Sequence, residues 1–300
     1  AGIPSQKLSV PVPVTYQQNS LSLELATLLG IPADISFFIG ASDGCLANLG
    51  SLCLSSREAA ITIGTSAAVR ITTKNPVQKP AQMIFNYLLE EGTYVSGGAI
   101  NNGGNVFQWL LNNLFAGHAS VKTYEDLFRL LASVPAGSDN LLFLPYLHGE
   151  RAPIWDERSC GVYFGLTARH GLAHMAKAAS EGVGFALRQI LALLEEACGP
   201  VQQLRVSGGL VETPVVMQLL ADITNMEVVV QQTEDASAIG AAMLVLKETG
   251  MIDNYGSIPW EEGQVYVPNA QHAATYQALF PVYKNLYPIL KDSMHSITPF

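Results

Sequence analysis

The sequence has few charged residues and no long apolar run, and each of these features argues against a class of protein. Only 14% of its 300 residues are charged whereas 49% are hydrophobic, so the chain can bury a large core. Acidic residues outnumber basic ones, 25 to 16, and the net charge of -9 argues against nucleic acid or an anionic membrane as a partner. No stretch has the length of a membrane span or the pattern of a signal peptide.

Cysteines, metal-ligand patterns and repeats are also scarce. The cysteines are Cys45, Cys53, Cys160 and Cys198. They lack the spacing of a metal site or a disulfide framework, which favours a reducing, cytoplasmic setting. His170 and His174 lie four residues apart, but no glutamate stands between them as in H-E-x-x-H, so no metal site is predicted. Because the chain begins at Ala1 in a proline-containing stretch, we expect it to be the interior of a longer polypeptide.

The pattern that is present is the mixture of strands and helices of an α/β protein. We expect a short helix over 20–29 and a buried strand over 35–39. Further strands are expected over 59–63, 68–73, 93–99, 204–206 and 228–230. Further helices are expected over 105–116, 174–196, 214–225 and 236–249, the last of these being the final helix of the chain.

Asp43 follows the expected strand 35–39 and stands among small residues, Gly40, Ala41, Ser42 and Gly44. A residue in this place can cap the helix that follows, a role that either Ser42 or Asp43 would fill. A carboxylate here can also act as a general base toward a sugar hydroxyl, which the small neighbours would allow to approach. Both interpretations stay open, because they exclude each other only if the side chain folds back on its own helix.

Gly64-Thr65-Ser66 forms a turn between two expected strands. It is either an ordinary hairpin turn or a loop whose backbone N–H groups and two hydroxyls surround a phosphate. Phosphoryl transfer needs a base for the attacking hydroxyl and a turn for the phosphates. Asp43 and this turn together therefore suggest a small-molecule kinase.

Two glycine-rich turns follow. The first contains Gly97, Gly98, Gly103 and Gly104. Close approach of a ligand would explain these glycines, and so would a loop with left-handed residues. The second, Gly208-Gly209, lies between a strand and a helix, where free N–H groups and the helix dipole suit a ligand. It does not match the G-x-G-x-x-G dinucleotide fingerprint.

Six motifs occur in one order along the chain. They are Gly-Ala-Ser-Asp-Gly at 40–44, Ile-Gly-Thr-Ser at 63–66, Phe-Leu-Pro-Tyr-Leu-His-Gly-Glu-Arg-Ala-Pro-Ile-Trp-Asp at 143–156, Gly-Val-Tyr-Phe-Gly-Leu at 161–166, Val-Ser-Gly-Gly at 206–209 and Glu-Asp-Ala-Ser-Ala-Ile-Gly-Ala-Ala at 234–242. The series resembles the FGGY carbohydrate kinases over nearly the whole chain. Within that family, segments 40–44 and 101–104 look most like the gluconate kinases, and the xylulose kinases share segments 149–153 and 161–165 almost as well.

The resemblance implies the actin-like, ribonuclease-H-like fold: a mixed sheet flanked by helices in each of two domains, with ATP and substrate in the cleft between them. By position, Asp43 corresponds to the catalytic base and Thr65 to the phosphate loop. The residues implied in nucleotide binding are Gly64, Thr65, Ser66, Gly103, Gly104, Gly208 and Gly209. Segment 234–242 matches the closing helix behind the adenosine pocket. ATP and Mg²⁺ are the implied cofactors, and no protein ligand of a metal is predicted.

The same resemblance indicates which parts have no counterpart. Residues 1–54 look like the C-terminal remnant of the first, substrate-side domain, and residues 55–300 like the whole second, nucleotide-side domain. The Asp-x-Gly-Thr phosphate turn of the first domain has no match in this sequence. A missing N-terminal domain is therefore an expected partner, and the chain alone is not expected to phosphorylate a sugar efficiently.

The predicted function is ATP-dependent phosphorylation of a sugar or sugar acid, with gluconate as the first candidate. The alternatives are a xylulose kinase and a non-catalytic actin-like module that binds nucleotide or sugar. A homodimer is compatible with the sequence. Arg151 and Asp156 are candidates for an ion pair, at the cleft edge or in a solvated loop, and Trp109 is expected in the core.

Overall fold

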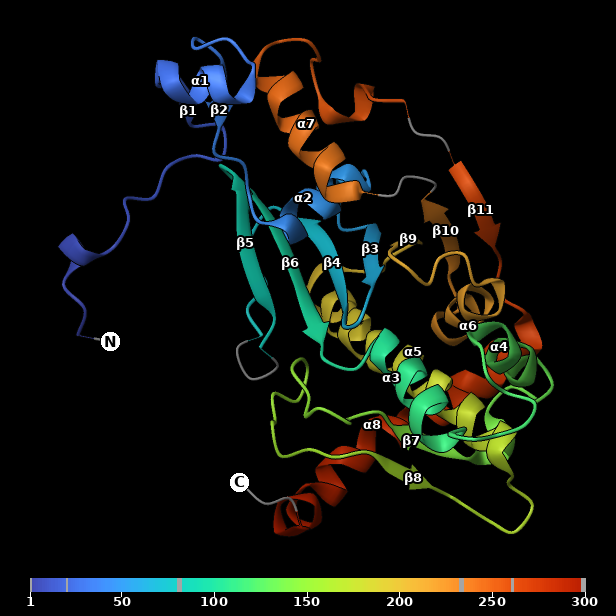
Figure 1. Cartoon of the computed structure of the whole chain (residues 1–300). Coiled ribbons are helices and arrows are strands. Elements are labelled where there is room, and N and C mark those ends of the chain that lie inside the picture. Colours follow the sequence, from blue (N-terminus) through green and yellow to red (C-terminus); the bar gives the residue numbers. More distant parts are fainter. Residues whose placement is uncertain (1, 20, 80–82, 232–234, 260–261, 298–300) are drawn as a thin grey trace.

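The computed structural model describes residues 2–19, 21–79, 83–231, 235–259 and 262–297. Its centre is a seven-stranded mixed sheet in the order β11-β10-β9-β3-β4-β6-β5 (Figure 1). The strands are β3 (Glu58–Ile63), β4 (Ala67–Thr73), β5 (Phe85–Glu90), β6 (Thr93–Ile100), β9 (Gln203–Ser207), β10 (Glu227–Gln231) and β11 (Glu262–Tyr266). Strand β9 runs parallel to β3 and β10, and the other neighbouring pairs are antiparallel.

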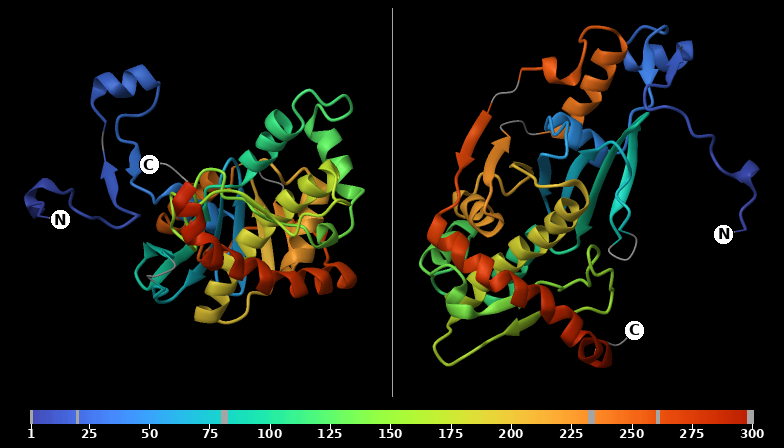
Figure 2. Two further views of the ribbon diagram at one scale, coloured as in Figure 1. Left: turned by 90° about the horizontal axis from the view of Figure 1, so that it is seen from below. Right: turned by 180° about the vertical axis from the view of Figure 1, so that it is seen from behind.

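Helices cover both faces of this sheet (Figures 1 and 2). One face carries α5 (Leu172–Cys198) and α6 (Pro214–Thr224). The other carries α2 (Asp43–Gly50) and α7 (Ala236–Glu248). The mixed sheet flanked by helices that the sequence predicts is therefore present.

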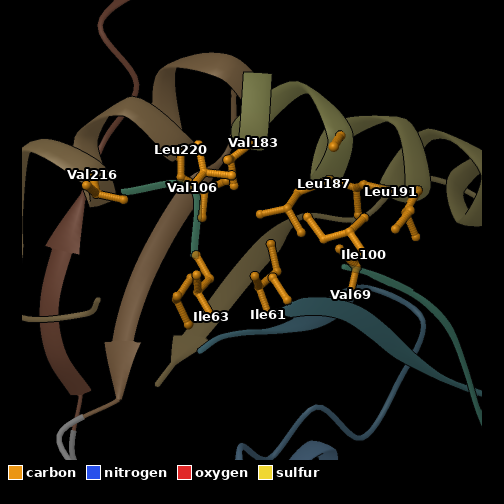
Figure 3. Close-up of a cluster of buried hydrophobic side chains, with 14 of the residues drawn as sticks. Ile61, Ile63, Val69, Ile100, Val106, Val183, Leu187, Leu191, Val216 and Leu220 are labelled. Carbon is orange, nitrogen blue, oxygen red and sulfur yellow. The ribbon is translucent and has the colours of Figure 1, made fainter. Parts of the chain in front are cut away.

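The largest apolar cluster lies between the sheet and α5 (Figure 3). Ile61 and Ile63 point to the same side because side chains alternate along a strand, and Val69 of β4 joins them. They meet Leu187 and Leu191, which lie one helical turn apart on α5. Burying each such side chain contributes about 1.5–3 kcal/mol. Because Ile63 is the last residue of β3, this packing also anchors the turn that follows it.

Helices α2 and α7 cross at two glycines. A Cβ on Gly50 would overlap the carbonyl oxygen of Ala236, and a Cβ on Gly240 would overlap the carbonyl oxygen of Leu46. The absence of side chains at both positions lets the two backbones touch. This contact holds α2, with Asp43 at its start, against α7.

The remaining elements lie around this body. They are η1 (Ser5–Lys7), β1 (Gln17–Asn19), α1 (Leu23–Leu29), β2 (Ser36–Phe38), α3 (Gly104–Trp109), the π-helical η3 (Leu110–Leu114), α4 (Tyr124–Ala132), η4 (Ser138–Asn140), β7 (Leu142–Leu144), β8 (Val162–Phe164), η5 (Tyr255–Ser257) and α8 (Ala270–Ile297). Strands β1 and β2 form a two-stranded sheet that, with α1, projects from the body (Figures 1 and 2). None of the described helices is both long enough and apolar enough to cross a bilayer.

The expected strands 59–63, 68–73, 93–99, 204–206 and 228–230 are confirmed to within about two residues, as are the helices 174–196, 214–225 and 236–249. Three predictions are wrong. The strand near 35–39 is not buried, because among the described residues β2 forms a two-stranded sheet with β1 and Phe37 is 39% exposed. The α-helix expected over 105–116 gives way to π-helix after Trp109. Helix α7 is not the final helix, since α8 follows it and contains Pro281 and Pro288, residues that normally interrupt a helical pattern.

Candidate functional site

Asp43 is the first residue of α2 and does not cap it. The cap is Ser42, whose hydroxyl accepts a hydrogen bond from the backbone nitrogen of Cys45 at 3.5 Å. The exposed Asp43 side chain accepts one from the Gly44 nitrogen at 2.6 Å. The positive end of the helix dipole favours a carboxylate at this position. Of the two capping candidates it is therefore Ser42 that caps. Oδ1 of Asp43 is bonded to its own helix through Gly44, whereas Oδ2 has no hydrogen-bond partner among the described residues and is the oxygen available to a ligand.

Asp43 lies at a hollow of about 560 Å³, named here the Asp43 cavity. Its described lining includes Asp43, Ser66, Arg70, Tyr87 and Arg151. These residues come from α2, the turn after β3, β4, β5 and the loop after β7. The volume is within the usual range for a small-molecule site.

A second hollow, of about 430 Å³, lies on the other side of the turn and is named here the turn cavity. It brings together four of the predicted nucleotide residues, Gly64, Thr65, Gly104 and Gly209. Its described lining also includes Asn105, Gln108, Tyr124, Phe128 and Thr213. None of its described lining residues is charged, so an anion bound there would be held by backbone N–H groups and hydroxyls.

The turn Gly64-Thr65-Ser66 joins β3 to β4 as a hairpin, in which the Gly64 nitrogen donates to the Ser66 carbonyl oxygen at 2.9 Å. All three residues are exposed. Gly64 and Thr65 line the turn cavity, whereas Ser66 lines the Asp43 cavity. The turn therefore lies between the two hollows and contributes to both.

Gly103 and Gly104 are placed against this turn by protein contacts. Their nitrogens donate to the carbonyl oxygens of Thr65 and Gly64, at 3.3 and 2.8 Å. A Cβ on Gly104 would stand 2.6 Å from the Gly64 oxygen. Close approach thus explains these glycines, but the approaching group is backbone. Neither glycine has a positive φ, so the left-handed explanation is wrong for both.

Gly97 and Gly98 lie within β6, also without a positive φ. A Cβ on Gly97 would overlap the Val69 carbonyl oxygen, and one on Gly98 would stand 3.0 Å from Ile190. Close sheet and helix packing accounts for both, and neither lies in the described lining of either hollow.

Gly208 and Gly209 differ in their surroundings. Gly208 has a φ of +103° and lies against the backbone of Ile63, so it shapes the loop. Gly209 lines the turn cavity, and a Cβ there would meet nothing within 4 Å. Helix α6 begins at Pro214 after the cap Thr213, which also lines the turn cavity.

Glu150 fastens the loop before α3 to the loop after β7. This buried carboxylate accepts hydrogen bonds from the side chain of Asn102 at 2.9 Å and from the backbone nitrogen of Arg151 at 2.8 Å. Burial raises the pKa of Glu150, and these hydrogen bonds partly offset the rise. Glu150 lies in the motif at 143–156 but was not predicted as a functional residue; a glutamate between glycine and arginine was the signal for it.

Arg151 and Asp156 do not form the expected pair. Arg151 donates to the carbonyl oxygen of Ile100 at 2.9 Å. Asp156 is bound instead by His295 at 2.6 Å and by the Tyr287 hydroxyl at 2.7 Å, both from α8. The partners of Asp156 could not be predicted, because they lie on α8, a helix that was not predicted.

The structure also shows the surroundings of the two histidines, of Trp109 and of segment 234–242. His170 Nδ1 accepts a hydrogen bond from the Thr167 nitrogen at 2.9 Å, and His174 Nε2 lies 3.3 Å from Asp139. Trp109 stacks on Phe143 and is half-buried against the main apolar cluster, so it lies at the edge of the core for which it was predicted. In segment 234–242, position 234 lies outside the described residues, and α7 begins at Ala236.

Sequence reasoning missed the aromatic wall of the turn cavity and the arginine of the Asp43 cavity. Tyr124 and Phe128 stack at 6.0 Å between ring centroids and come from α4, which was not predicted. Its signal was present: Thr123 and Asp126 form a capping box. Arg70 is a single basic residue in the otherwise uncharged strand β4, which was the signal for it.

Comparison with known proteins adds to this geometry. The model of the FGGY family of carbohydrate kinases, C-terminal domain, matches residues 59–247. The gluconokinase of Bacillus subtilis (strain 168) is 38% identical over 309 residues, which cover 100% of this chain and 60% of that protein. The chain therefore spans about 60% of the length of this curated relative.

Solved structures agree in fold. The gluconate kinase from Lactobacillus acidophilus superposes with a TM-score of 0.90 at 34% identity, over 95% of this chain and 58% of that chain. The ligand-bound xylulose kinase from Lactobacillus acidophilus gives the same values, a TM-score of 0.90 at 34% identity over 95% and 58% of the two chains. The arrangement of sheet and helices is thus the one found in these kinases.

Proposed function

We propose, from the premise that this chain belongs to the FGGY family of carbohydrate kinases and has their actin-like fold, that it carries part of the catalytic site of an ATP-dependent gluconate kinase. The proposed acceptor rests on the gluconokinase of Bacillus subtilis, which is 38% identical to this chain. A xylulose kinase is the second candidate, because a solved xylulose kinase is as similar in structure as a gluconate kinase is.

The observation that carries the proposal is the position of one turn between two hollows. Ser66 borders the hollow that contains Asp43, and Thr65 borders the hollow that contains Gly104 and Gly209. A phosphoryl group must pass from a nucleotide to a hydroxyl that a base has prepared. The two cavities adjoin, one of them contains the Asp43 carboxylate, and the turn Gly64-Thr65-Ser66 lies between them. This arrangement suits such a transfer.

In the proposed reaction, Asp43 orients the acceptor hydroxyl and accepts its proton as the hydroxyl oxygen bonds to the γ-phosphorus of ATP, while the bond from that phosphorus to the β,γ-bridging oxygen breaks and ADP leaves. The Gly64 N–H is already bonded to the Ser66 carbonyl oxygen, so the backbone N–H groups of Thr65 and Ser66 would face the phosphates and stabilise the negative charge that develops on them. Bound ATP would supply the transferred phosphoryl group. The small residues Ala67 and Ala68 leave room for the acceptor beside Ser66.

The residues of the turn cavity fit a nucleotide. Gly209 borders open space, where a Cβ would meet no atom within 4 Å, so a phosphate can approach its backbone. Tyr124 and Phe128 offer an aromatic surface on which the adenine ring can stack. Asn105 and Thr213 offer polar groups to the nucleotide. We therefore assign the phosphates to the turn and the adenosine to the aromatic wall.

Mg²⁺ is proposed only as the companion of the phosphates. Among the described residues, no group of three or more His, Cys, Asp or Glu side chains is arranged to hold a metal ion. Because Mg²⁺ usually keeps several waters and binds substrate phosphates through one or two carboxylates, such a group is not required.

The domain division after residue 54 is also a proposal. The projecting unit of β1, α1 and β2 supports it, since this unit stands apart from the central sheet (Figure 1). Helix α2, which precedes the proposed boundary, packs on α7 and on the sheet. We therefore place α2 at the joint between the two proposed units.

The test is a substrate panel on the product of the complete reading frame that encodes this chain. D-gluconate, D-xylulose, glycerol and other polyols are each supplied with ATP, and the phosphorylated product is identified by mass spectrometry. We expect gluconate to give the highest kcat/KM. A higher value for xylulose would replace the first candidate by the second. Nucleotide binding without turnover of any acceptor would favour the non-catalytic module.

A further inference from the structure

Arg70 is a cation in the Asp43 cavity that the proposed reaction does not use. It lies on β4, on the sheet face that carries α2, and borders the hollow together with Asp43. Gly44 makes room for it, since a Cβ on Gly44 would stand 3.0 Å from Nε and 3.2 Å from Nη2 of Arg70. The guanidinium therefore occupies space that an ordinary residue after Asp43 would fill.

The Arg70 guanidinium is only partly satisfied by the described residues. Nη1 donates to the Thr62 hydroxyl at 3.1 Å. Nε is buried and has no hydrogen-bond partner among the described residues. No described carboxylate lies within 4.0 Å of the guanidinium, although Asp43 is near enough to interact through space. A buried charged donor without a partner is unfavourable. Nε itself is covered, so the guanidinium would gain from an anion that its Nη groups meet in the hollow.

The charges around the hollow give its preferred ligand. Its described lining contains one carboxylate, Asp43, and two guanidinium groups, Arg70 and Arg151. Arg151 is already bound to the Ile100 carbonyl oxygen. The hollow thus has a local excess of one positive charge in a protein whose net charge is -9. That excess suits an acceptor with a single negative charge.

We propose that Arg70 is a specificity residue that binds the carboxylate of a sugar-acid acceptor while Asp43 faces the hydroxyl to be phosphorylated. Arginine suits this role because its paired N–H groups match the two oxygens of a carboxylate. The inference rests on the proposed function, since it assumes that the Asp43 cavity holds the acceptor. It adds that the acceptor class is an aldonate, not a neutral sugar.

The competing source of negative charge is the phosphoryl group in transfer. The two sources are separated by comparing D-gluconate with D-gluconamide, which has the same carbon chain but no charge. The variant is Arg70→Met, measured in the product of the complete reading frame. Arg57→Met is the control, because Arg57 is an exposed arginine outside both hollows.

We expect wild type and Arg57→Met to prefer gluconate over gluconamide. Arg70→Met should raise KM for gluconate about tenfold to a hundredfold, the usual cost of losing a charged hydrogen bond, and should leave gluconamide nearly unchanged. Arg70→Lys keeps the charge but not the paired donors, so it should lose less of the preference. It is also the second variant if Arg70→Met does not fold.

Other outcomes overturn the inference. An equal fall in kcat for both acceptors would mean that Arg70 serves Asp43 or the phosphoryl group. If Arg70→Met still prefers gluconate over gluconamide as wild type does, Arg70 does not bind the acceptor carboxylate, and the proposed function is unaffected. If wild type phosphorylates no acceptor, the proposed function fails, and calorimetric binding of gluconate and gluconamide to wild type and Arg70→Met still decides whether Arg70 reads the carboxylate.

Discussion

Gly103 packs directly against Ser66, so closely that a Cβ on Gly103 would stand 2.7 Å from the Ser66 carbonyl carbon. The start of α3 and the turn after β3 are therefore one unit, joined by backbone contacts from both sides. Because backbone atoms cannot rotate away as a side chain can, substitutions at this contact should move the turn itself.

Gly103→Ala should lower the free energy of unfolding by about 1–3 kcal/mol, the scale of overpacking, and weaken binding of a non-hydrolysable ATP analogue. The control is Gly171→Ala, because Gly171 also caps a helix but a Cβ there would meet nothing within 4 Å. Both variants share the modest loss of replacing a capping glycine by alanine. Equal effects of the two in urea unfolding and calorimetry would contradict the crowding argument.

Asp43→Asn should reduce kcat by at least ~100-fold, because the amide cannot accept the hydroxyl proton as a base. The thermal unfolding temperature should stay close to that of wild type, since the carboxylate is exposed and the cap is Ser42. Asp253→Asn, at an exposed position outside both hollows, is the control. A folded Asp43→Asn with near-wild-type kcat would reject Asp43 as the base.

Gly240→Ala should destabilise the protein by about 2 kcal/mol or more, although alanine is the better helix former by about 1 kcal/mol. The new Cβ would overlap the carbonyl oxygen of Leu46 on α2. Gly184→Ala is the matched control, because the three atoms nearest to its Cβ all belong to the Ile223 side chain and none to a backbone. Urea unfolding of both variants measures the difference, and equal stability would show that the crossing of α2 and α7 is loose.

The buried carboxyl of Glu181 should make stability depend on pH. Burial raises its pKa to about 7, and Lys177, Ser138 and Tyr276 limit the rise. Since the unfolded value is 4.5, the folded protein binds the proton more tightly between pH 4.5 and about 7. The stabilising contribution is complete below pH 4.5 and is lost as the pH rises through about 7.

Glu181→Gln removes this titration while its amide can still bond with Gly137 and Ser138, which now donate to the carboxylate. The free energy of unfolding of wild type should fall by up to about 3 kcal/mol relative to that of the variant between pH 5 and pH 8. Urea unfolding at several pH values measures this. Parallel profiles for the two proteins would mean that Glu181 does not titrate in this window.

Local signals predicted the parts of the fold in which local preference and packing agree. The hairpin at Gly64-Thr65-Ser66 and the long helix α5 were visible because glycine, alternation and helical periodicity marked them. Helix α8 was not, because Pro281 and Pro288 interrupt the pattern that a helix prediction depends on, although tertiary packing keeps the helix continuous. Sequence periodicity alone therefore could not predict the last helix.

Several residues that line the two hollows were singled out from the sequence, but their arrangement was not predictable. Asp43 and Thr65 were both singled out, yet the structure puts Ser66, not Thr65, in the hollow with Asp43. Arg70 was missed because one arginine in a strand is usually a solvated surface residue, and only the fold reveals that it is half-buried, with its Nε covered beside Gly44. Such pairings depend on contacts between distant segments, which no local pattern encodes.

The crossing of α2 and α7 limits which amino-acid substitutions this sequence can accept. Two neighbours in an ordinary core can exchange volume, so that one grows while the other shrinks and the packing is kept. Gly50 and Gly240 have no such freedom, because each already has the smallest side chain and each faces a carbonyl oxygen. The helix that presents Asp43 thus depends on a position in α7 that touches neither hollow, and no second mutation in side-chain size can compensate for its loss.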